Sequence, residues 1–403
     1  MTERIVIVGA GHAAGEMCVA LRHAGFAGPI SLIGDEPHLP YQRPPLSKAY
    51  LKGEMELERL LVRPAEFYDD NNIELRLGVR AAAIDRTGTE VKLADGSSVP
   101  YDKLALLTGT RARELPVPGA DLAGVHYVRT IRDIDGFLAS FKYGDRLAVV
   151  GGGYIGLEIA ASASKYGLKA TVVERMPRLL ARVATEQTAA KIHKLHADRG
   201  ADILLDAALE RMTGDGKVRS LELADGKPIE TDVVIVGIGV VPNQELAADA
   251  GLETGNGIIV DENCRTSDPN IFAAGDVAEH PNKVFGRVRL ESVQNAVQQA
   301  KVCALNMLGK QVPYVAVPWF WSDQFEVRMQ SAGLPQNFDQ IVERPGKNDY
   351  SGSNWLFRGG QLIAVEALSD PKSYMLGKRW LEQGKTPEPE RLANPDEDLK
   401  KLV

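Results

Sequence analysis

The sequence has 403 residues, enough for two or three domains, and its 44% hydrophobic and 25% charged residues are ordinary for a globular protein. A formal net charge of −7 gives no global attraction to nucleic acid or to an anionic membrane, and no run of about 20 uncharged apolar residues could span a bilayer. The first apolar run ends at the glycines of residues 9–15, which is typical of a first strand and not of a secretory signal, so we expect a cytoplasmic protein.

The first predicted element is a buried strand that runs into a glycine-rich turn and a helix. Gly9 and Gly11 begin a G-x-G-x-x-G pattern in which Ala14 takes the third small position, and a second strand at 30–33 leads to Asp35. In such a pattern the glycines admit a pyrophosphate to the helix N-terminus, and the acid about 20 residues on binds ribose hydroxyls. This part of the chain is therefore predicted to bind a dinucleotide.

The next segment, 40–48, is rigid and carries a positive charge. Pro44 and Pro45 stiffen the backbone, Ser47 is a candidate cap for a helix that starts near Lys48, and Lys48 ends the segment. It is either a surface loop before a helix or a rigid element beside a cofactor.

Three further stretches complete the first part of the chain. Residues 72–99 alternate apolar and polar side chains in short runs, which predicts a small antiparallel meander. Residues 102–110 predict a buried strand that ends in a glycine turn, and 111–124, rich in Pro and Gly, predict a linker.

A second and complete fingerprint follows a buried strand at the middle of the chain. Gly151, Gly153 and Gly156 fit G-x-G-x-x-G, a helix is predicted over 157–166, and Glu174 comes after the next strand. One such motif is weak evidence, but two with their acids predict two dinucleotides, which suggests a flavin and a nicotinamide. The alternative is two strand–helix turns without ligands.

The rest of this second part repeats the plan of the first. A helix at about 185–199 and a meander around the turn at 224–226 lead to an apolar strand at 232–243. Within that strand, Gly237 and Gly239 would let a ligand approach the backbone. The repetition predicts a duplicated or nested architecture.

The chain then returns to a small-residue strand over 266–277. This strand ends at Gly275, and Asp276 is suited to bind a polyol hydroxyl. A helix follows for which Glu291 or Ser292 is a fair N-cap, and its N-terminus is a candidate dipole for a flavin edge.

The last part begins with the aromatic segment 318–324. If it is extended, Trp319 and Trp321 share one face and Phe320 takes the other. These rings are either core or stack near an isoalloxazine. The tail from Gln383, rich in Pro, Glu and Asp, is predicted to be a solvated surface segment.

Three cysteines are present, Cys18, Cys264 and Cys303, and none is close to another in sequence. Without a C-x-x-C motif a redox-active dithiol is disfavoured, and no Cys/His spacing suggests a metal site. We expect three buried thiols and no metal.

On four segments the chain resembles the FAD- and NADH-dependent ferredoxin reductase family of the putidaredoxin reductase and biphenyl-dioxygenase reductase type. These segments are 43–48, 151–158, 266–276 and 318–324, and the resemblance covers nearly the whole length. One departure is Thr108-Gly109-Thr110, where relatives usually have Ala-Thr-Gly.

The resemblance implies an α/β fold with two nested Rossmann-like, glutathione-reductase-like dinucleotide-binding domains and a C-terminal α+β domain. The implied domains are an FAD-binding domain in two segments, 1–110 and 242–318, an NAD-binding domain at 111–241, and a C-terminal domain at 319–403 that covers the flavin.

It also implies the residues of the site. Lys48 would lie near the flavin N5 and pair with Glu158, and Trp321 would stack near flavin and nicotinamide with Trp319 behind it, which makes Lys48, Glu158 and Trp321 the expected catalytic residues. The full expected cofactor-binding set is Gly9, Gly11, Ala13, Ala14, Asp35, Arg43, Pro45, Lys48, Ala81, Arg129, Gly275, Asp276, Ser292, Val293, Trp319, Trp321, Gly151, Gly153, Tyr154, Ile155, Gly156, Glu174, Gly237, Ile238 and Gly239.

The implied function is that of an NADH-dependent flavoprotein reductase. It would pass electrons one at a time from FAD to a small [2Fe-2S] ferredoxin that feeds a cytochrome P450 or a Rieske-type oxygenase. NADH gives two electrons at once and an iron–sulfur protein takes one, so a flavin is needed between them. Glu174 favours NADH, because the 2′-phosphate of NADPH would face a carboxylate. We expect a monomer or weak homodimer that binds neither nucleic acid nor membrane.

Two other functions remain open on the same scaffold. One is an NADH oxidase or quinone reductase, and the other is an NADH-sensing flavoprotein of the apoptosis-inducing-factor type. The disulfide-reductase class is disfavoured by the cysteine spacing.

Overall fold

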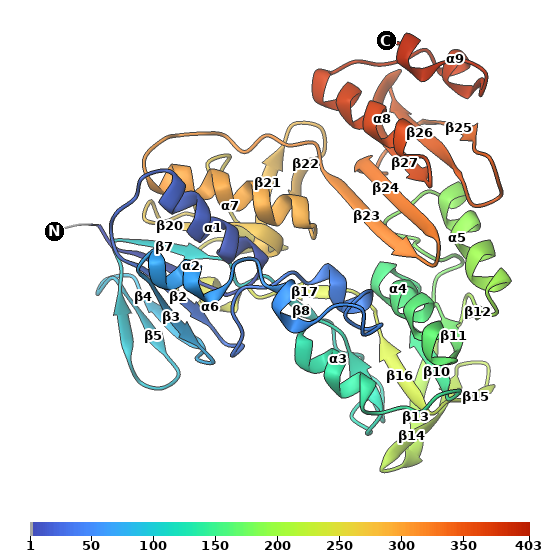
Figure 1. Cartoon of the computed structure of the whole chain (residues 1–403), viewed down its shortest axis with the longest axis horizontal. Coiled ribbons are helices and arrows are strands. Elements are labelled where there is room, and N and C mark those ends of the chain that lie inside the picture. The colour runs from blue at the N-terminus through green and yellow to red at the C-terminus, as the bar shows by residue number, and fades with distance from the viewer. Residues whose placement is uncertain (1–2) are drawn as a thin grey trace. The chain divides into compact units, whose positions relative to one another are not determined.

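The computed structural model describes residues 3–403, which divide into two compact units (Figure 1). Unit 1 is made of the described residues up to Arg43 together with Glu56–Arg111 and Val241–Pro318. Unit 2 is made of Pro44–Met55, Ala112–Val240 and Trp319–Val403. Each unit is built around its own parallel sheet.

The sheet of unit 1 has five parallel strands in the order β20-β7-β1-β2-β3. Their bounds are β1 Ile5–Val8, β2 Ile30–Gly34, β3 Ile73–Leu77, β7 Lys103–Leu106 and β20 Ile271–Ala273. The central strand β1 is apolar and buried at all four positions, as expected for a strand covered on both faces.

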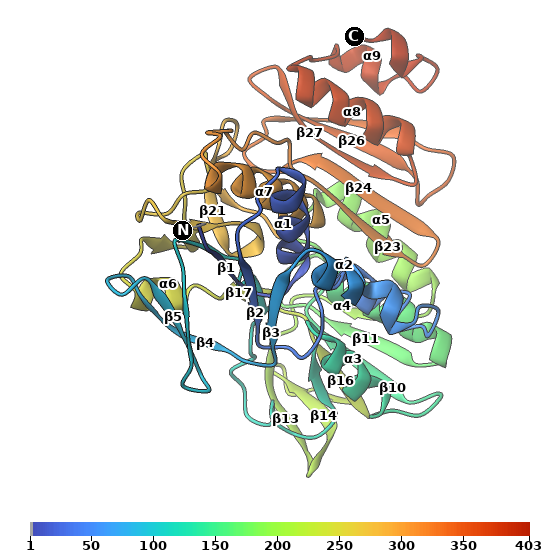
Figure 2. The same ribbon diagram turned by 60° about the vertical axis from the view of Figure 1, so that its left-hand side comes forward.

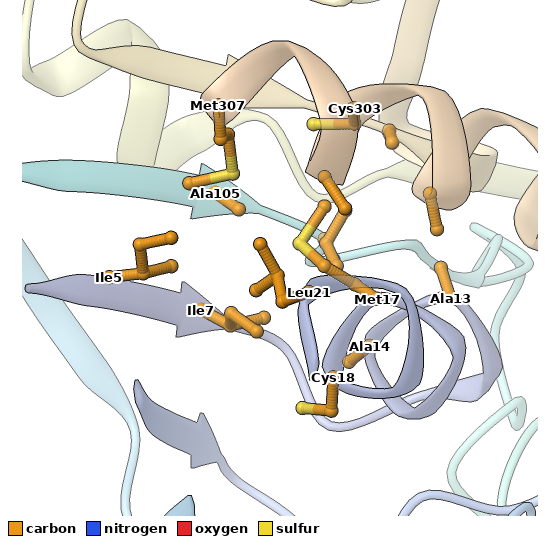
Figure 3. Packing of buried hydrophobic residues seen from close by; sticks show 14 of the residues in the cluster. Ile5, Ile7, Ala13, Ala14, Met17, Cys18, Leu21, Ala105, Cys303 and Met307 are labelled. Atoms are coloured by element: carbon orange, nitrogen blue, oxygen red, sulfur yellow. The ribbon is translucent and has the colours of Figure 1, made fainter. Parts of the chain in front are cut away.

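Helices α1 (His12–His23) and α7 (Val293–Met307) lie side by side along one face of this sheet (Figures 1 and 2). Figure 3 shows the core between them, in which Met17 and Leu21 of α1 point toward Ile5, Ile7 and Met307. All five side chains are almost completely buried. This packing holds the start of α1, and hence the glycine turn before it, against the sheet.

The opposite face of the sheet is covered by an antiparallel meander. It consists of β4 (Ala81–Asp85), β5 (Glu90–Leu93) and β6 (Ser98–Pro100), and Val91 packs with Val6 and Leu104 of the parallel strands.

The prediction that residues 72–99 are all meander is wrong for Ile73–Leu77, which forms β3 and pairs in parallel with β2. An alternating run suits an edge strand as well as a meander. Here Leu75 packs on the core, and Glu74 accepts a hydrogen bond from Ser31 of β2 at 2.6 Å.

Unit 2 repeats this plan. Its five parallel strands have the order β12-β11-β10-β16-β9, so the strand before the glycine turn is again central. The bounds are β9 Val125–Tyr127, β10 Arg146–Val150, β11 Lys169–Val173, β12 Asp202–Leu204 and β16 Val233–Val236. Its helices are α3 Ile131–Leu138, α4 Tyr154–Ala163 and α5 Glu186–Asp198, and its meander is β13 Leu209–Asp215, β14 Lys217–Leu223 and β15 Pro228–Glu230. The expected pair of Rossmann-like sheets is confirmed.

The C-terminal part of unit 2 is an antiparallel sheet with a helix against it, as the predicted α+β class requires. The strand order is β23-β24-β27-β26-β25, with bounds β23 Trp319–Gln324, β24 Val327–Gly333, β25 Gln340–Pro345, β26 Gly352–Arg358 and β27 Gln361–Leu368. Helix α8 (Pro371–Gln383) packs on β27 and β24 (Figure 2).

The tail after Gln383 is largely exposed, as predicted, but a few apolar side chains anchor it. It contains α9 (Pro389–Ala393) and a 3-10 turn, η5 (Leu399–Lys401), and Leu392 and Leu399 are buried. The guanidinium of Arg344 donates to the carbonyls of Leu392 at 3.0 Å and Glu397 at 2.7 Å. The polar composition of the tail hides these few apolar anchors.

The smaller elements complete the chain. They are η1 Pro44–Ser47, η2 Leu57–Leu60, α2 Ala65–Asp70, β8 Thr110–Ala112, η3 Ser164–Tyr166, β17 Val240–Pro242, α6 Glu245–Asp249, β18 Thr254–Gly255, β19 Gly257–Ile259, η4 Gly275–Val277, β21 Ala278–Asn282 and β22 Gly286–Arg289.

Candidate active site

The first glycine turn joins β1 to α1 in unit 1. Gly9 has φ +108°, and a Cβ on it would lie 2.2 Å from the carbonyl oxygen of Leu107. A Cβ on Gly11 would meet no protein atom within 4 Å. Gly9 is therefore required by the fold, whereas the space above Gly11 is open to a ligand.

The second turn joins β10 to α4 in unit 2 and has the same division of roles. Gly151 has φ +104°, and its Cβ would lie 2.5 Å from the carbonyl oxygen of Gly237. The nearest atom to a Cβ on Gly153 would be 3.8 Å away, which is an ordinary contact distance, so the fold itself does not require glycine there. A Cβ on Gly156 would lie 2.9 Å from Cγ1 of Val149, so this glycine allows helix and strand to pack closely.

Helix α4 begins at Tyr154, three residues before the predicted start. Its N-cap, Gly153, and the N-cap of α1, Gly11, make no side-chain cap hydrogen bond. Side chains do cap the other helices of eight or more residues in the described chain, namely α3 by Thr130, α5 by Thr185, α7 by Ser292 and α8 by Asp370. The two helix ends at the glycine turns thus leave their N–H groups for an anion, which fits two pyrophosphates.

Glu174, expected at a ribose, follows β11 and braces the glycine turn of unit 2. Its Oε2 accepts from the backbone N–H of Gly152 at 2.7 Å, and its Oε1 accepts from that of Met176, also at 2.7 Å. A carboxylate has about four acceptor positions, so two remain for hydroxyls.

Two neighbouring acids follow β2 in unit 1. Asp35 is exposed, whereas Glu36 accepts from the Tyr41 hydroxyl at 2.7 Å and from Arg43 Nη2 at 2.8 Å. Glu36 therefore fixes the direction of Arg43, and Asp35 is the acid of the pair that faces solvent.

Gly275, the first residue of η4, meets the start of α1. A Cβ on it would lie 3.3 Å from Cβ of Ala13, and its N–H donates to Oε1 of Gln299 at 2.8 Å. Asp276 follows directly in η4. The expected cap Ser292 is confirmed, since its side chain accepts from the N–H of Asn295 at 3.1 Å.

The remaining expected residues take their places along the same elements. Ala14 is buried in α1, Ala81 begins β4, Val293 begins α7, Pro45 lies in η1, Arg129 precedes the cap of α3, Ile155 lies in the first turn of α4 and is 39% exposed, and Ile238 and Gly239 follow β16.

Lys48 and Glu158 form a largely buried ion pair in unit 2. Lys48 Nζ lies 2.6 Å from Glu158 Oε2, and the two side chains are 17% and 4% exposed. The hydroxyl of Ser47 also donates to Oε2, at 2.5 Å, and the hydroxyl of Ser322 donates to Oε1, at 2.6 Å. Both serines were missed as site residues.

The prediction that Ser47 caps a helix starting near Lys48 is wrong. A 3-10 turn, η1, ends at Ser47, and its side chain bonds to Glu158 instead. Proline at two successive positions restricts this segment to a short turn.

The aromatic residues of β23 lie on alternate faces, as predicted. The rings of Trp319 and Trp321 are 5.8 Å apart, and the ring of Phe320 packs at 4.5 Å on Tyr154 of α4. Burial, and then the nearby charges of Glu366 and Glu158, raise the pKa of Tyr154 well above its usual value. Tyr154 is therefore a neutral hydroxyl at the start of α4.

The three cysteines are free and fully buried, as predicted. Burial raises the pKa of Cys18 to about 12, and burial followed by a hydrogen bond with Cys264 raises the pKa of Cys303 well above its usual value. Thiols in this state are poor nucleophiles. The contact between Cys264 and Cys303 could not be seen in their sequence spacing.

Residues 108–110, where the sequence departs from the expected family pattern, are held by hydrogen bonds to Asn243. The Thr108 hydroxyl donates to the carbonyl of Asn243 at 2.7 Å, and the Asn243 amide donates back to the carbonyl of Thr108 at 2.8 Å. This reciprocal pair closes the glycine turn at Gly109.

None of the helices within residues 3–403 has the length and apolarity needed to cross a bilayer. No group of three or more His, Cys, Asp or Glu side chains in that range is arranged to hold a metal ion.

Two family models match successive parts of the chain. A model described as pyridine nucleotide-disulphide oxidoreductase matches residues 3–300, and one described as reductase C-terminal matches residues 319–403.

Comparisons with single proteins extend over the whole chain. Rhodocoxin reductase of Rhodococcus erythropolis is 45% identical over 401 residues, covering 99% of this chain and 94% of that protein. The crystal structure of the ferredoxin reductase for the CYP199A2 system from Rhodopseudomonas palustris is 41% identical, with a TM-score of 0.96 and 100% of both chains covered. Putidaredoxin reductase in its covalent complex with putidaredoxin is 37% identical, with a TM-score of 0.96 and 99% and 98% of the chains covered.

Proposed function

This chain belongs to the pyridine nucleotide-disulphide oxidoreductases and, among them, to the FAD- and NADH-dependent ferredoxin reductases, and on that premise we propose that it passes electrons from NADH to a small [2Fe-2S] ferredoxin. The ferredoxin in turn supplies electrons to a cytochrome P450 or a Rieske-type oxygenase. Similar proteins carry the names rhodocoxin reductase and putidaredoxin reductase, and one was solved in a covalent complex with putidaredoxin, which supports a small redox protein as the partner.

One observation carries the assignment of two nucleotides. Among the longer helices of the described chain, only α1 and α4 begin at a glycine turn without a side-chain cap. FAD, when bound, accepts two electrons from NADH and releases them singly. The chain's own residues bind the nucleotides, orient them and keep water from the site.

We assign FAD to the turn of unit 1 and NADH to the turn of unit 2. The open space above Gly11 and the acids Asp35 and Asp276 suit the larger resident cofactor. Gly153 and Glu174 suit the nicotinamide nucleotide, and Glu174 disfavours a 2′-phosphate. The proposed domains are 1–110 with 242–318 for FAD, 111–241 for NAD, and 319–403 as a cover for the flavin.

Lys48 has the role of a fixed positive charge beside the flavin, and Glu158 keeps it in place. Trp321, with Trp319 behind it, supplies an aromatic surface for the flavin and nicotinamide rings. The segment Pro44–Met55 belongs to unit 2, together with Glu158 and Trp321. The three proposed catalytic residues thus come from three segments of one compact unit.

The three free thiols suit a reducing compartment, and we propose that the enzyme acts in the cytoplasm as a monomer or weak homodimer.

The test is NADH-driven reduction of cytochrome c by the purified flavoprotein, with and without each of a panel of [2Fe-2S] ferredoxins. We expect the rate to depend on at least one ferredoxin and to fall as salt rises, because charges at the rim of the docking surface speed association. Fast oxygen or quinone reduction without any ferredoxin would favour an NADH oxidase. A long-lived reduced flavin with slow turnover would favour a sensor of the apoptosis-inducing-factor type.

A further inference from the structure

The carboxylate of Glu158 is held by three segments of unit 2. Helix α4 carries it, the segment with Ser47 and Lys48 bonds one oxygen, and Ser322 of β23 bonds the other. We propose that Ser322 is a positioning residue, which keeps the Glu158 carboxylate in the orientation that holds Lys48 for the reaction. This inference rests on the proposed function, since it assigns Ser322 a part in NADH-dependent flavin reduction.

The two carboxylate oxygens have different partners. Oε2 accepts from both Lys48 Nζ and the Ser47 hydroxyl, at 2.6 and 2.5 Å. Oε1 accepts from the Ser322 hydroxyl at 2.6 Å, and Ser322 itself is fully buried. A buried carboxylate with one oxygen unsatisfied is costly, so without Ser322 the group would turn to share its remaining donors. Lys48 would then move with it.

The direction of the Ser322 hydroxyl is set by two further buried residues. Gln324 Nε2 donates to Ser322 Oγ at 3.1 Å, and Gln324 Oε1 lies 2.8 Å from Nε2 of His196 in α5. Burial lowers the pKa of His196, so the ring is neutral near pH 7 and Nε2 carries its proton toward the amide oxygen. Because Ser322 already accepts from Gln324, its own proton is free to point at Glu158.

Unit 2 contains a second buried carboxylate, which is held by threonine donors. Glu366 accepts from the Thr185 hydroxyl at 2.6 Å and the Thr188 hydroxyl at 2.5 Å. Burial raises its pKa, with those hydrogen bonds acting in the opposite direction. Glu366 forms no ion pair within residues 3–403, whereas Glu158 is paired with Lys48. Ser322 therefore acts on a carboxylate that holds a cation.

The experiment compares Ser322→Ala with Ser353→Ala in the flavin-loaded full chain. Ser353 is a matched control, because it is a buried serine of the same C-terminal sheet whose hydroxyl contacts Ser373 and Trp355 and not Glu158. Stopped-flow absorbance gives the limiting rate of flavin reduction and the dissociation constant for NADH. Both substitutions are repeated in a Glu158→Leu background, which removes both acceptor oxygens of residue 158, and unfolding of all variants is measured.

We expect Ser322→Ala to lower the limiting rate about tenfold, the size expected for one hydrogen bond to a charged group, with NADH affinity changed by less than about twofold. Ser353→Ala should leave the rate within about twofold. In the Glu158→Leu background, where the contact is already absent, Ser322→Ala should add less than about twofold, because the two residues act through one contact.

Three results would overturn the proposal. The first is equal slowing by Ser322→Ala and Ser353→Ala, which would indicate general loosening of the sheet. The second is a full tenfold effect of Ser322→Ala in the Glu158→Leu background. The third is additive effects of Ser322→Ala and Glu158→Leu on the free energy of unfolding, a readout that needs no turnover. Failure of the wild-type protein to be reduced by NADH would instead refute the proposed function, and the unfolding cycle would still decide whether Ser322 acts through Glu158.

Discussion

Lys48 Nζ lies 2.6 Å from Glu158 Oε2, and the glutamate side chain is only 4% exposed. The lysine comes from a short turn after two prolines, and the glutamate from a helix that starts at a glycine turn. We propose that the pair has a role in the reaction, in which Lys48 supplies the charge and Glu158 fixes its position.

Removing only one partner of this ion pair should destabilise the folded protein. Lys48→Met should lower the free energy of unfolding by about 3 kcal/mol, because it leaves the Glu158 carboxylate buried without a cation. Adding Glu158→Gln should restore most of that stability without restoring the rate of flavin reduction by NADH. Chemical denaturation and stopped-flow absorbance measure the two effects. A Lys48→Met protein reduced at the wild-type rate would remove Lys48 from the mechanism.

The two glycines of the first turn should respond differently to the same substitution. Gly9→Ala should destabilise the protein by about 2–4 kcal/mol, since φ is positive and Leu107 blocks the new methyl group. Gly11→Ala should leave the stability of the apoprotein within about 0.5 kcal/mol but lower its flavin content. Urea unfolding and the visible absorbance of purified protein test this. Normal flavin loading of Gly11→Ala would show that the cofactor does not use this turn.

Glu174 should govern the choice of nicotinamide nucleotide. Glu174→Ala should narrow the NADH to NADPH ratio of kcat/KM by about tenfold, because the charge that repels a 2′-phosphate is gone. The carboxylate also holds the N–H groups of Gly152 and Met176, so some loss with both nucleotides is expected. Glu174→Gln, which keeps an acceptor oxygen, separates the two effects. An unchanged ratio in both variants would mean that the acid does not face the ribose.

His280 should make the protein less stable in mild acid. Burial lowers its pKa to about 4 in the folded state, against about 6.5 when unfolded. Below pH 6.5 the unfolded chain therefore binds the proton first, so the stability present above pH 6.5 is lost as the pH falls toward 4. At pH 5 this single group lowers the free energy of unfolding by about 2 kcal/mol.

His280→Gln should flatten the dependence of unfolding free energy on pH between pH 7 and 5. The same change at His23, an exposed position, is the control and should leave the slope as it is. The pKa values of the buried His196 and of the partly buried His12 and His126 are also lowered, so part of the slope will remain. An unaltered slope in His280→Gln would show that folding does not lower the pKa of His280.

Much of the fold could be predicted from the sequence because its signals are local. The strand–glycine–helix turns, the cap at Ser292 and the alternation of Trp319 and Trp321 each depend on a few neighbouring residues. The position of Ile73–Leu77 in the parallel sheet could not be predicted, since an alternating run suits a parallel edge strand as well as a meander. The packing of Leu392 was hidden by the charged residues around it.

The candidate site was predictable where a motif or a family pattern named the residue. Lys48 and Glu158 are far apart in sequence, and only the resemblance suggested that they pair. Ser322 and Gln324 were visible as part of a distinctive segment, but their contacts depend on how β23 lies on α4. Nothing in the sequence pointed to a contact of His196 with Gln324, because a single histidine in a helix is not specific for any role.

The most direct test of the account is an anaerobic titration of the purified protein with NADH, followed by oxidised [2Fe-2S] ferredoxin. The account predicts a yellow protein whose flavin is reduced by about one equivalent of NADH and reoxidised by about two equivalents of ferredoxin. A protein that stays colourless after reconstitution with FAD, or whose reduced flavin transfers no electrons to any ferredoxin tested, would contradict it.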